Sequence, residues 1–226
     1  MTSTSGSYSF NPETADIVVE SFERIGKQAD FLEAPGVLRS ARRSMNLIQS
    51  DWSNRGPNLW KVGLYSIPLI QGTATYTLPS QTVMVLNVYL SQTGQSDRIL
   101  APISRSTYAA LPSKTQQSSP TQYYLDRQTI PTITFWASPD LSSTYTANLY
   151  LFSQQQDITA SAQGVDVPFR WWEALCSELA LRLAVKFAPD RVAMLQPMAQ
   201  EAYLHAANED VERVPMNLTP NLRGYQ

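Results

Sequence analysis

Apolar residues recur at helical spacing near the beginning of the chain. Between residues 12 and 29 they repeat every three or four positions, which predicts an amphipathic helix. Pro12 suits the first helical position, Asn11 can cap it, and Glu13 and Asp16 would complement the helix dipole. Gly26 can end this helix early. The predicted buried stripe is Ala15, Val18, Phe22, Ile25 and Ala29.

A second helix is expected after Pro35, and the Asn-Arg-Gly-Pro sequence at residues 54–57 should stop it. Arg39 and Arg43 would then point away from the buried side. The predicted stripe is Leu38, Ala41, Met45, Ile48 and Trp52.

Apolar residues in the C-terminal part also have helical spacing, and three residues there indicate where helices end, begin or bend. Pro189 should end one helix, and Asp190 can cap the next turn. Pro197 predicts either a kink or a helix that starts near Gln196 and runs to about Arg213. The predicted stripe before Pro189 is Phe169, Trp172, Leu175 or Cys176, Leu179, Leu183 and Phe187.

The middle of the chain alternates apolar and polar residues with a period of two, between turn residues. This pattern predicts strands, of which the last three should form an antiparallel meander. A short helix is expected at 103–111 and an exposed loop at 112–120. The predicted strands cover residues 60–64, 74–78, 83–90, 122–127, 132–136 and 145–152.

These elements predict an α+β fold. The N- and C-terminal helices form a helical bundle, because each is too short to be stable alone. An antiparallel β module, sandwich or barrel-like, is inserted between them. The predicted division is a flexible segment (1–11), the first half of the helical domain (12–59), the β domain (60–165), the second half of the helical domain (166–213) and an extended tail (214–226).

Composition sets the β module apart from the helices. Charged residues make up 16% of the chain, whereas about a quarter is usual. Residues 60–165 contain only nine of the 36 charged side chains, so the deficit belongs to the β module. Its polarity comes from Ser, Thr and Gln instead. We interpret a neutral surface of this kind as one that neighbouring molecules cover.

Charge and cysteine content exclude several classes of protein. A pI near 5.4 without a basic run argues against a protein that binds nucleic acid mainly through phosphates. Cys176 is the only cysteine, which excludes an internal disulfide and a cysteine zinc cage. The beginning of the chain lacks signal-peptide features, and no stretch is apolar enough to span a bilayer. We expect synthesis in the cytoplasm, without a metal or cofactor.

Catalytic patterns are weak. His205 is the only histidine and lies in an alanine-rich helical run, where packing or a surface role explains it. Cys176 suits a small buried apolar position. Gly63, Gly72 and Gly94 are isolated and indicate turns or strands rather than a phosphate loop. Carboxylates that could serve glycoside hydrolysis are Glu20, Glu23, Glu209, Asp210 and Glu212, all at positions typical of solvated helix faces.

Two groups are candidates for intersubunit or DNA-channel contacts. Arg39 and Arg43, with Arg42 between them, form the densest basic cluster, which a solvated helix face or salt bridges would also explain. Trp171 and Trp172 are adjacent, so one helix face cannot bury both equally. One should face the core, and the other the β module or another subunit.

Several motifs, in order, resemble one family. They are the sequences ARRSMNLIQSDWSNRGPNLW at 41–60, TYTLP at 75–79, FWASPD at 135–140, VPFRWWEAL at 167–175 and LALRLA at 179–184. Together they resemble the head-to-tail adaptor proteins of tailed bacteriophages, nearest to the connector or tail tubular proteins of short-tailed phages. The resemblance covers most of residues 12–213.

This resemblance implies a structural virion protein at the head–tail junction, not an enzyme. It implies a homo-oligomeric ring, usually of twelve copies, that docks under the portal protein, meets the tail nozzle or tube, and extends the channel through which DNA passes without specific binding. The implied portal-binding tail contains Pro215, Leu218, Pro220, Leu222, Arg223 and Tyr225. The alternatives are another tail or baseplate protein with a β-sandwich and, last, a cell-wall glycosidase.

Overall fold

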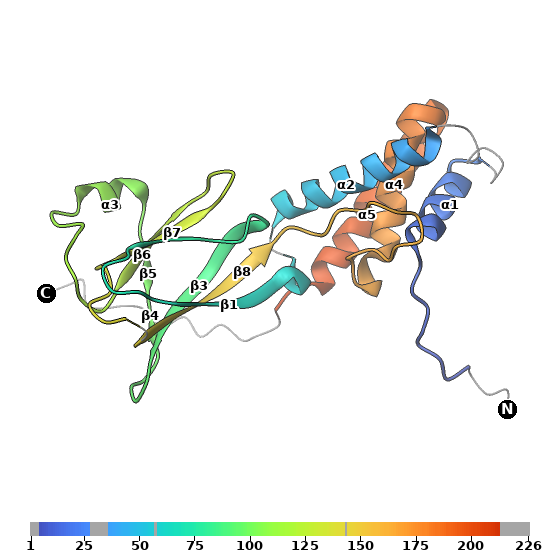
Figure 1. Cartoon of the computed structure of the whole chain (residues 1–226). Helices are drawn as coiled ribbons and strands as arrows, with labels where there is room; N and C mark the ends of the chain where they lie inside the picture. The colour runs from blue at the N-terminus through green and yellow to red at the C-terminus, as the bar shows by residue number, and fades with distance from the viewer. Residues whose placement is uncertain (1–4, 28–35, 57, 143, 213–226) are drawn as a thin grey trace, which may run out of the picture.

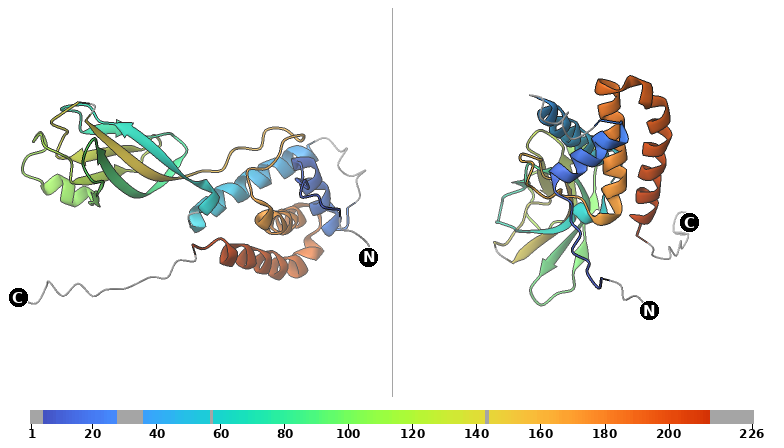
Figure 2. Two further views of the ribbon diagram at one scale, coloured as in Figure 1. Left: turned by 90° about the horizontal axis from the view of Figure 1, so that it is seen from below. Right: turned by 90° about the vertical axis from the view of Figure 1, so that its right-hand side faces the viewer.

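Four of the five described α-helices gather at one end of the molecule, and the strands lie at the other end together with the short helix α3 (Figures 1 and 2). The structure, a computed structural model, describes residues 5–27, 36–56, 58–142 and 144–212. Helical segments from both ends of the chain pack together, and the strands come from the middle. This arrangement confirms the predicted α+β fold, while the predicted domain boundaries stay a prediction.

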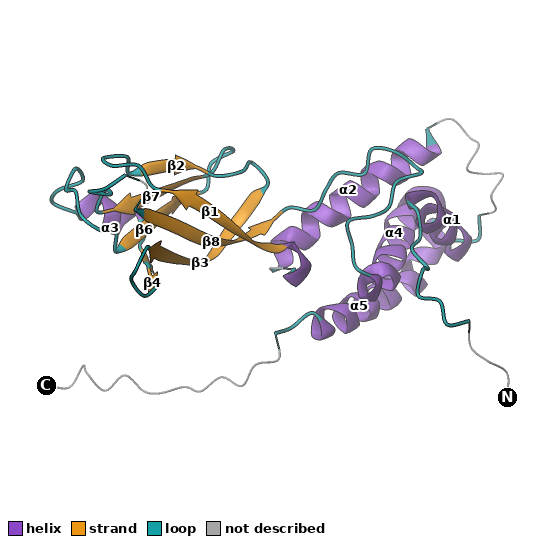
Figure 3. Cartoon of the chain, turned by 60° about the horizontal axis from the view of Figure 1, so that its bottom comes forward, coloured by secondary structure: helices purple, strands orange, loops and turns teal. Residues whose placement is uncertain are grey.

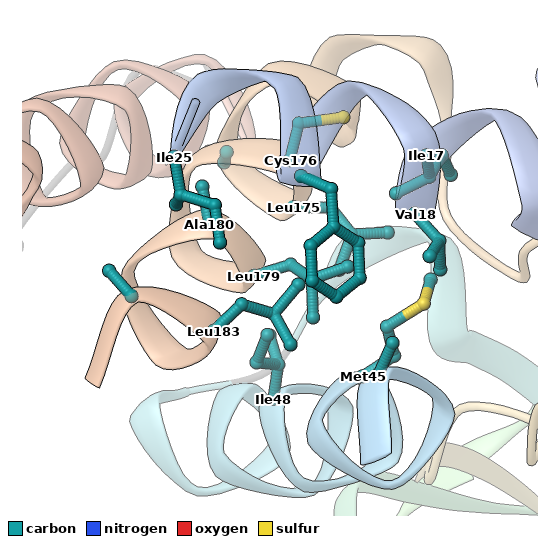
Figure 4. Packing of buried hydrophobic residues seen from close by; sticks show 14 of the residues in the cluster. Ile17, Val18, Ile25, Met45, Ile48, Leu175, Cys176, Leu179, Ala180 and Leu183 are labelled. Carbon is teal, nitrogen blue, oxygen red and sulfur yellow. The ribbon is translucent and has the colours of Figure 1, made fainter. Parts of the chain in front are cut away.

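The described part of the chain contains five α-helices, of which α4 is central. It packs against α1, α2 and α5, so helices from both ends of the sequence share one core. Figure 4 shows the apolar side chains between them. The helices are α1 (Thr14–Arg24), α2 (Val37–Arg55), α3 (Arg105–Ala110), α4 (Trp172–Phe187) and α5 (Val192–Glu209), with 3₁₀ turns η2 (Leu59–Lys61), η3 (Phe169–Trp171) and η4 (Pro189–Arg191).

Helix α1 starts two residues later than predicted, at Thr14 instead of Pro12. The first two helical N–H groups, of Thr14 and Ala15, donate to the carbonyls of Gln163 and Ser161. Asp16 accepts a hydrogen bond from the backbone N–H of Glu13 at 2.9 Å, so Glu13 replaces Asn11 as the N-cap. The loop before α4 thus sets where α1 begins.

The end of α1 agrees with the prediction. Gly26 has a φ of 74°, and its N–H donates to the carbonyl of Glu23. The N–H of Lys27 donates to the carbonyl of Phe22, which completes a Schellman motif. Glycine tolerates this left-handed conformation, so Gly26 ends the helix.

The predicted stripes are correct in their centres and wrong at their ends. In α1, Val18, Phe22 and Ile25 are buried as predicted, whereas Ala15 is partly exposed; Ala29 lies outside the described residues. In α2, Leu38 is exposed and its neighbour Val37 is buried instead. Val37 lies four residues before the buried Ala41, one helical turn away, which keeps it on the same face.

The C-terminal helices exclude one of the two predicted outcomes for Pro197, a helix that starts near Gln196. Pro189 ends α4 as predicted, but α5 begins at Val192 and runs through Pro197. Proline at the sixth position costs the helix the single hydrogen bond that would reach Ala193. Asp190 does not cap α5: it lies inside η4, and the N-cap is Arg191 without a side-chain cap.

The strands form two four-stranded sheets, coloured orange in Figure 3. One has the order β1-β8-β3-β4 and the other β2-β7-β6-β5, and their apolar faces enclose a second core. The strands are β1 (Val62–Pro68), β2 (Thr75–Thr77), β3 (Thr82–Gln92), β4 (Arg98–Ile99), β5 (Ala101–Pro102), β6 (Gln122–Asp126), β7 (Thr132–Trp136) and β8 (Tyr145–Ser153).

Three details of the β prediction were wrong. Trp60 lies in η2 and not in a strand, because its ring joins the helical core. Strands β6 and β7 pair, but β8 belongs to the other sheet, since the chain crosses between sheets after β7 to close the core. The β5–β6 pair is parallel, whereas the remaining strand pairs are antiparallel.

Candidate functional site

The basic cluster of α2 is exposed where it was predicted to be. Arg39 and Arg43 lie on the solvent side of the helix, away from the buried stripe. Arg42 differs from both, since its Nη1 donates to the carbonyl of Thr159 at 2.5 Å. This hydrogen bond connects α2 to the segment between β8 and η3. Arg39 and Arg43 therefore form an accessible pair of positive charges.

Trp171 lies in an aromatic cluster at the junction between the helices and the β part. Its side chain is 1% exposed. Ring centroids lie 5.0 Å away at Trp52, 5.2 Å at Trp60 and 5.5 Å at Tyr203. Of the two adjacent tryptophans, Trp171 is therefore the one that faces the core.

Trp172 points to another side of the helices and is half-buried. Its Nε1 donates to the carbonyl of Val167 at 3.1 Å. Phe10 and Phe169 pack edge-on against its ring, with centroids 5.5 and 6.5 Å away, and both remain more than 70% exposed. These three rings form an aromatic surface that a neighbouring molecule could cover.

Two carboxylates hold the points where the chain crosses between the two parts. Asp166 accepts from Lys61 Nζ at 2.6 Å and from the backbone N–H of Gln156 at 2.9 Å. Asp210, whose side chain is 4% exposed, accepts from Arg170 and from the backbone N–H of Leu59. The two connecting segments, near Leu59 and near Gln156, are therefore hydrogen-bonded to carboxylates at the junction.

A groove of about 550 Å³ lies where β1 meets this junction. Its walls are residues 60–65 with Pro79, Gln81, Leu151 and residues 153–157. Gln155 is 4% exposed, and neither Nε2 nor Oε1 of its amide has a hydrogen-bond partner among the described residues. The sequence did not predict this groove, whose wall includes the three consecutive glutamines at 154–156.

Among the candidate catalytic residues, Cys176 is buried, and Glu20 and Asp210 form ion pairs. His205 is exposed, and its Nε2 lies 3.9 Å from Glu201 Oε1. Burial raises the pKa of the Cys176 thiol to about 11, so it is a poor nucleophile near neutrality. Glu20 pairs with Arg24 at 2.8 Å, and Asp210 is bonded as described above.

The described residues contain neither a candidate metal site nor a candidate membrane span. No group of three or more His, Cys, Asp or Glu side chains there could hold a metal ion. Within the same residues, no helix has the length and apolarity that crossing a membrane requires.

The residues predicted to bind the portal, from Pro215 to Tyr225, lie outside the described part of the chain.

The family model described as "SU10 adaptor protein" matches residues 15–221. A search of curated proteins found no match. The matched range includes every helix and strand of the structure except the first residue of α1.

Proposed function

Because this chain belongs to the SU10 adaptor protein family, a family of bacteriophage head–tail adaptors, we propose that it forms a ring that joins the portal to the tail nozzle or tube. The ring extends the DNA channel and contains twelve copies. The family match over residues 15–221 carries this proposal, since it spans both the helical and the β part.

The exposed surfaces support assembly into a ring. A ring needs a head-to-tail contact, in which one surface of a copy meets a different surface of the next. The elongated chain offers unlike surfaces at its two ends (Figure 2). The aromatic surface of Phe10, Phe169 and Trp172 lies on the helical part, and the neutral, Ser-, Thr- and Gln-rich surface on the β part.

The proposed roles of the predicted site residues follow from these positions. Trp172 contributes to a contact between subunits, whereas Trp171 supports it from the core. Arg39 and Arg43 remain candidates for a neighbouring subunit or for the channel, because both are exposed. The net charge of −2 per chain makes the assembled ring acidic, so DNA passes through the channel without being held.

Negative-stain images of the purified chain, alone and mixed with isolated portal, test this function. Rings stacked on the portal are the expected result. Fibres or trimers instead of rings would contradict the proposal and favour another tail component.

The C-terminal residues provide a second test of portal joining. Deletion of residues 215–226 should abolish binding to isolated portal while leaving the circular dichroism spectrum unchanged. Unchanged binding would remove these residues from the portal contact.

A further inference from the structure

Strand β1 is an open edge of its sheet. It pairs with β8 on one side only and is the terminal strand in the order β1-β8-β3-β4. Residues 63–66 are exposed and uncharged. The other terminal strands, β4, β2 and β5, have two or three residues, whereas β1 has seven. An edge of this length without charged residues is a template for an added strand.

The groove beside β1 contains a side chain that lacks its partners. The amide of Gln155 is buried at the groove wall, and both of its polar atoms are unpaired. A primary amide can donate to a peptide carbonyl and accept from a peptide N–H at the same time. Both polar atoms are buried, so the Gln155 side chain must turn toward the groove to reach a peptide backbone there. Because an unpaired buried amide is costly, such a bond would stabilise it.

The N-terminal arm, residues 5–12, is a peptide of the required kind. Its sequence Ser-Tyr-Ser-Phe at residues 7–10 alternates small polar and aromatic side chains, the period of a strand. Tyr8 is fully exposed, and Ser7 and Ser9 bond each other, with their Oγ atoms 2.8 Å apart. The arm carries no charge, and the groove wall has two charged residues, Lys61, which is paired with Asp166, and Asp157.

The lengths and positions of arm and edge also agree. Pro12 is buried in its own copy, so the part of the arm that can pair is residues 5–11, which span about 24 Å when extended, and the seven residues of β1 span about 23 Å. Pro12 and Pro68 lack an N–H, so each can terminate the pairing. The arm leaves α1 at the helical end, whereas β1 runs into the β part (Figure 1). This separation suits a contact between two copies better than one within a copy.

We infer that the arm of one copy adds as a strand to β1 of a second copy, with the Gln155 amide of the receiving copy bonded to the arm backbone. Tyr8 and Phe10 pack beside the edge strand, and the contact is head-to-tail. This inference rests on self-assembly of the proposed ring but assigns the contact to specific residues.

A photocrosslinking experiment tests this pairing. Tyr8 is replaced by p-benzoylphenylalanine in an unlabelled chain, which is mixed with heavy-nitrogen-labelled wild type, with and without isolated portal. After irradiation, mass spectrometry should find crosslinks from position 8 to residues 61–68 or 154–157 of the labelled chain. Three outcomes overturn the inference if they occur both with and without portal. They are crosslinks only within one chain, crosslinks only to residues 213–226, and no crosslinks.

Two variants of the labelled chain sharpen the test. A Cβ at Gly63 meets nothing within 4 Å and its φ is not positive, so Gly63→Glu should fold normally while placing a charge in the groove. We expect crosslinking to fall at least about tenfold. Gln155→Leu should lower crosslinking too, yet raise the melting temperature of the chain, because it removes an unpaired buried amide. Crosslinking as strong in both variants as in the wild-type chain overturns the inference.

The control is Thr115→Glu, which adds the same charge to the exposed loop after α3 and should leave crosslinking unchanged. The outcomes also separate this inference from the proposed function. Rings on the portal without crosslinks to the β1 groove leave the adaptor function standing and refute the pairing. Crosslinks to the groove without rings on the portal support the pairing and contradict the proposed ring.

Discussion

The helical part and the β part are stabilised by different interactions. Among the described residues, the helical part carries most of the ion pairs, such as Arg24–Glu173 at 2.6 Å and Arg55–Asp51 at 2.5 Å. Within the β part, one ion pair joins two described residues, Arg105 and Asp126. The difference shows that one chain can combine a charged frame with a neutral module.

Neutral hydrogen bonds take the place of charge in the β part. On the β1-β8-β3-β4 sheet, the Asn148 amide accepts from Ser66 Oγ at 2.6 Å and donates to Ser91 Oγ at 2.9 Å. On the other sheet, Thr75 and Thr134 share a hydrogen bond of 2.9 Å. Exposed hydroxyls, such as those of Ser66 and Thr75, can be covered by a neighbour at a lower desolvation cost than charges. The low charge content thus suits a surface that assembly buries.

The largest expected effect separates the two cores. Trp171→Ala should lower the free energy of unfolding of the helical part by about 3–5 kcal/mol. Phe135→Ala, in the β core, should cost the β part a similar amount. Urea titrations followed by helical circular dichroism and by proteolysis of the β part should show separate transitions. If each substitution shifts both probes equally, the two cores unfold as one unit.

Thiol labelling gives the next largest effect and reports on the helical core alone. With a pKa of about 11, native Cys176 should react with a maleimide near pH 8 about 100-fold more slowly than a free cysteine. Urea that opens the helical part should restore the rate. Fast labelling of the folded chain would contradict the burial of this thiol.

A pH titration should distinguish the helical part by a smaller effect. Arg24 lowers the pKa of Glu173 below its usual value of about 4.5 by hydrogen bonding. The pair therefore stabilises the fold fully above that value, and the contribution disappears as the pH falls through the lower folded pKa. The expected loss is about 0.5–1 kcal/mol, because Glu173 is largely exposed and solvent screens the pair.

The measurement is the free energy of unfolding between about pH 3 and pH 7. Glu173→Gln should remove this component of the pH dependence. Glu23→Gln, at an exposed position on α1, is the matched control and should retain it. An identical pH dependence in wild type and Glu173→Gln would contradict the assignment.

Salt should give the smallest effect. Raising the NaCl concentration from about 0.05 M to about 0.5 M should lower the stability of the helical part by a few tenths of a kcal/mol, because its surface ion pairs are screened. The free energy of unfolding of the β part should not decrease. A larger salt-induced loss in the β part would reverse the comparison.

The sequence predicted the elements better than it predicted their neighbours. Helical spacing located the centres of the stripes, such as Phe22 and Ile48, because a buried face repeats along its own helix. The start of α1 was missed because carbonyls of the loop at 161–163 determine it, and these are distant in sequence. The sheet to which β8 belongs was missed for the same reason.

The candidate surfaces show a similar division. Trp171 and Trp172 could be recognised as a pair with two directions, but only packing shows that Trp171 faces Trp52 and Trp60. The groove beside β1 could not be predicted, because alternation of residues does not tell whether a strand lies at an edge or in the centre. Gln155 is distinguished by its missing partners, which is a property of the fold.

Strands β1 and β8 also determine how the molecule bears mechanical load. Both connect to the helical part at the same end, where Val62 lies opposite Phe152. A force that draws the two parts apart therefore pulls both strands in one direction along their length. Strand β8 can slide out only if its whole ladder with β3, from Ser153 to Tyr145, breaks at once. The junction is thus loaded in shear, the geometry in which hydrogen bonds share tension rather than open one by one.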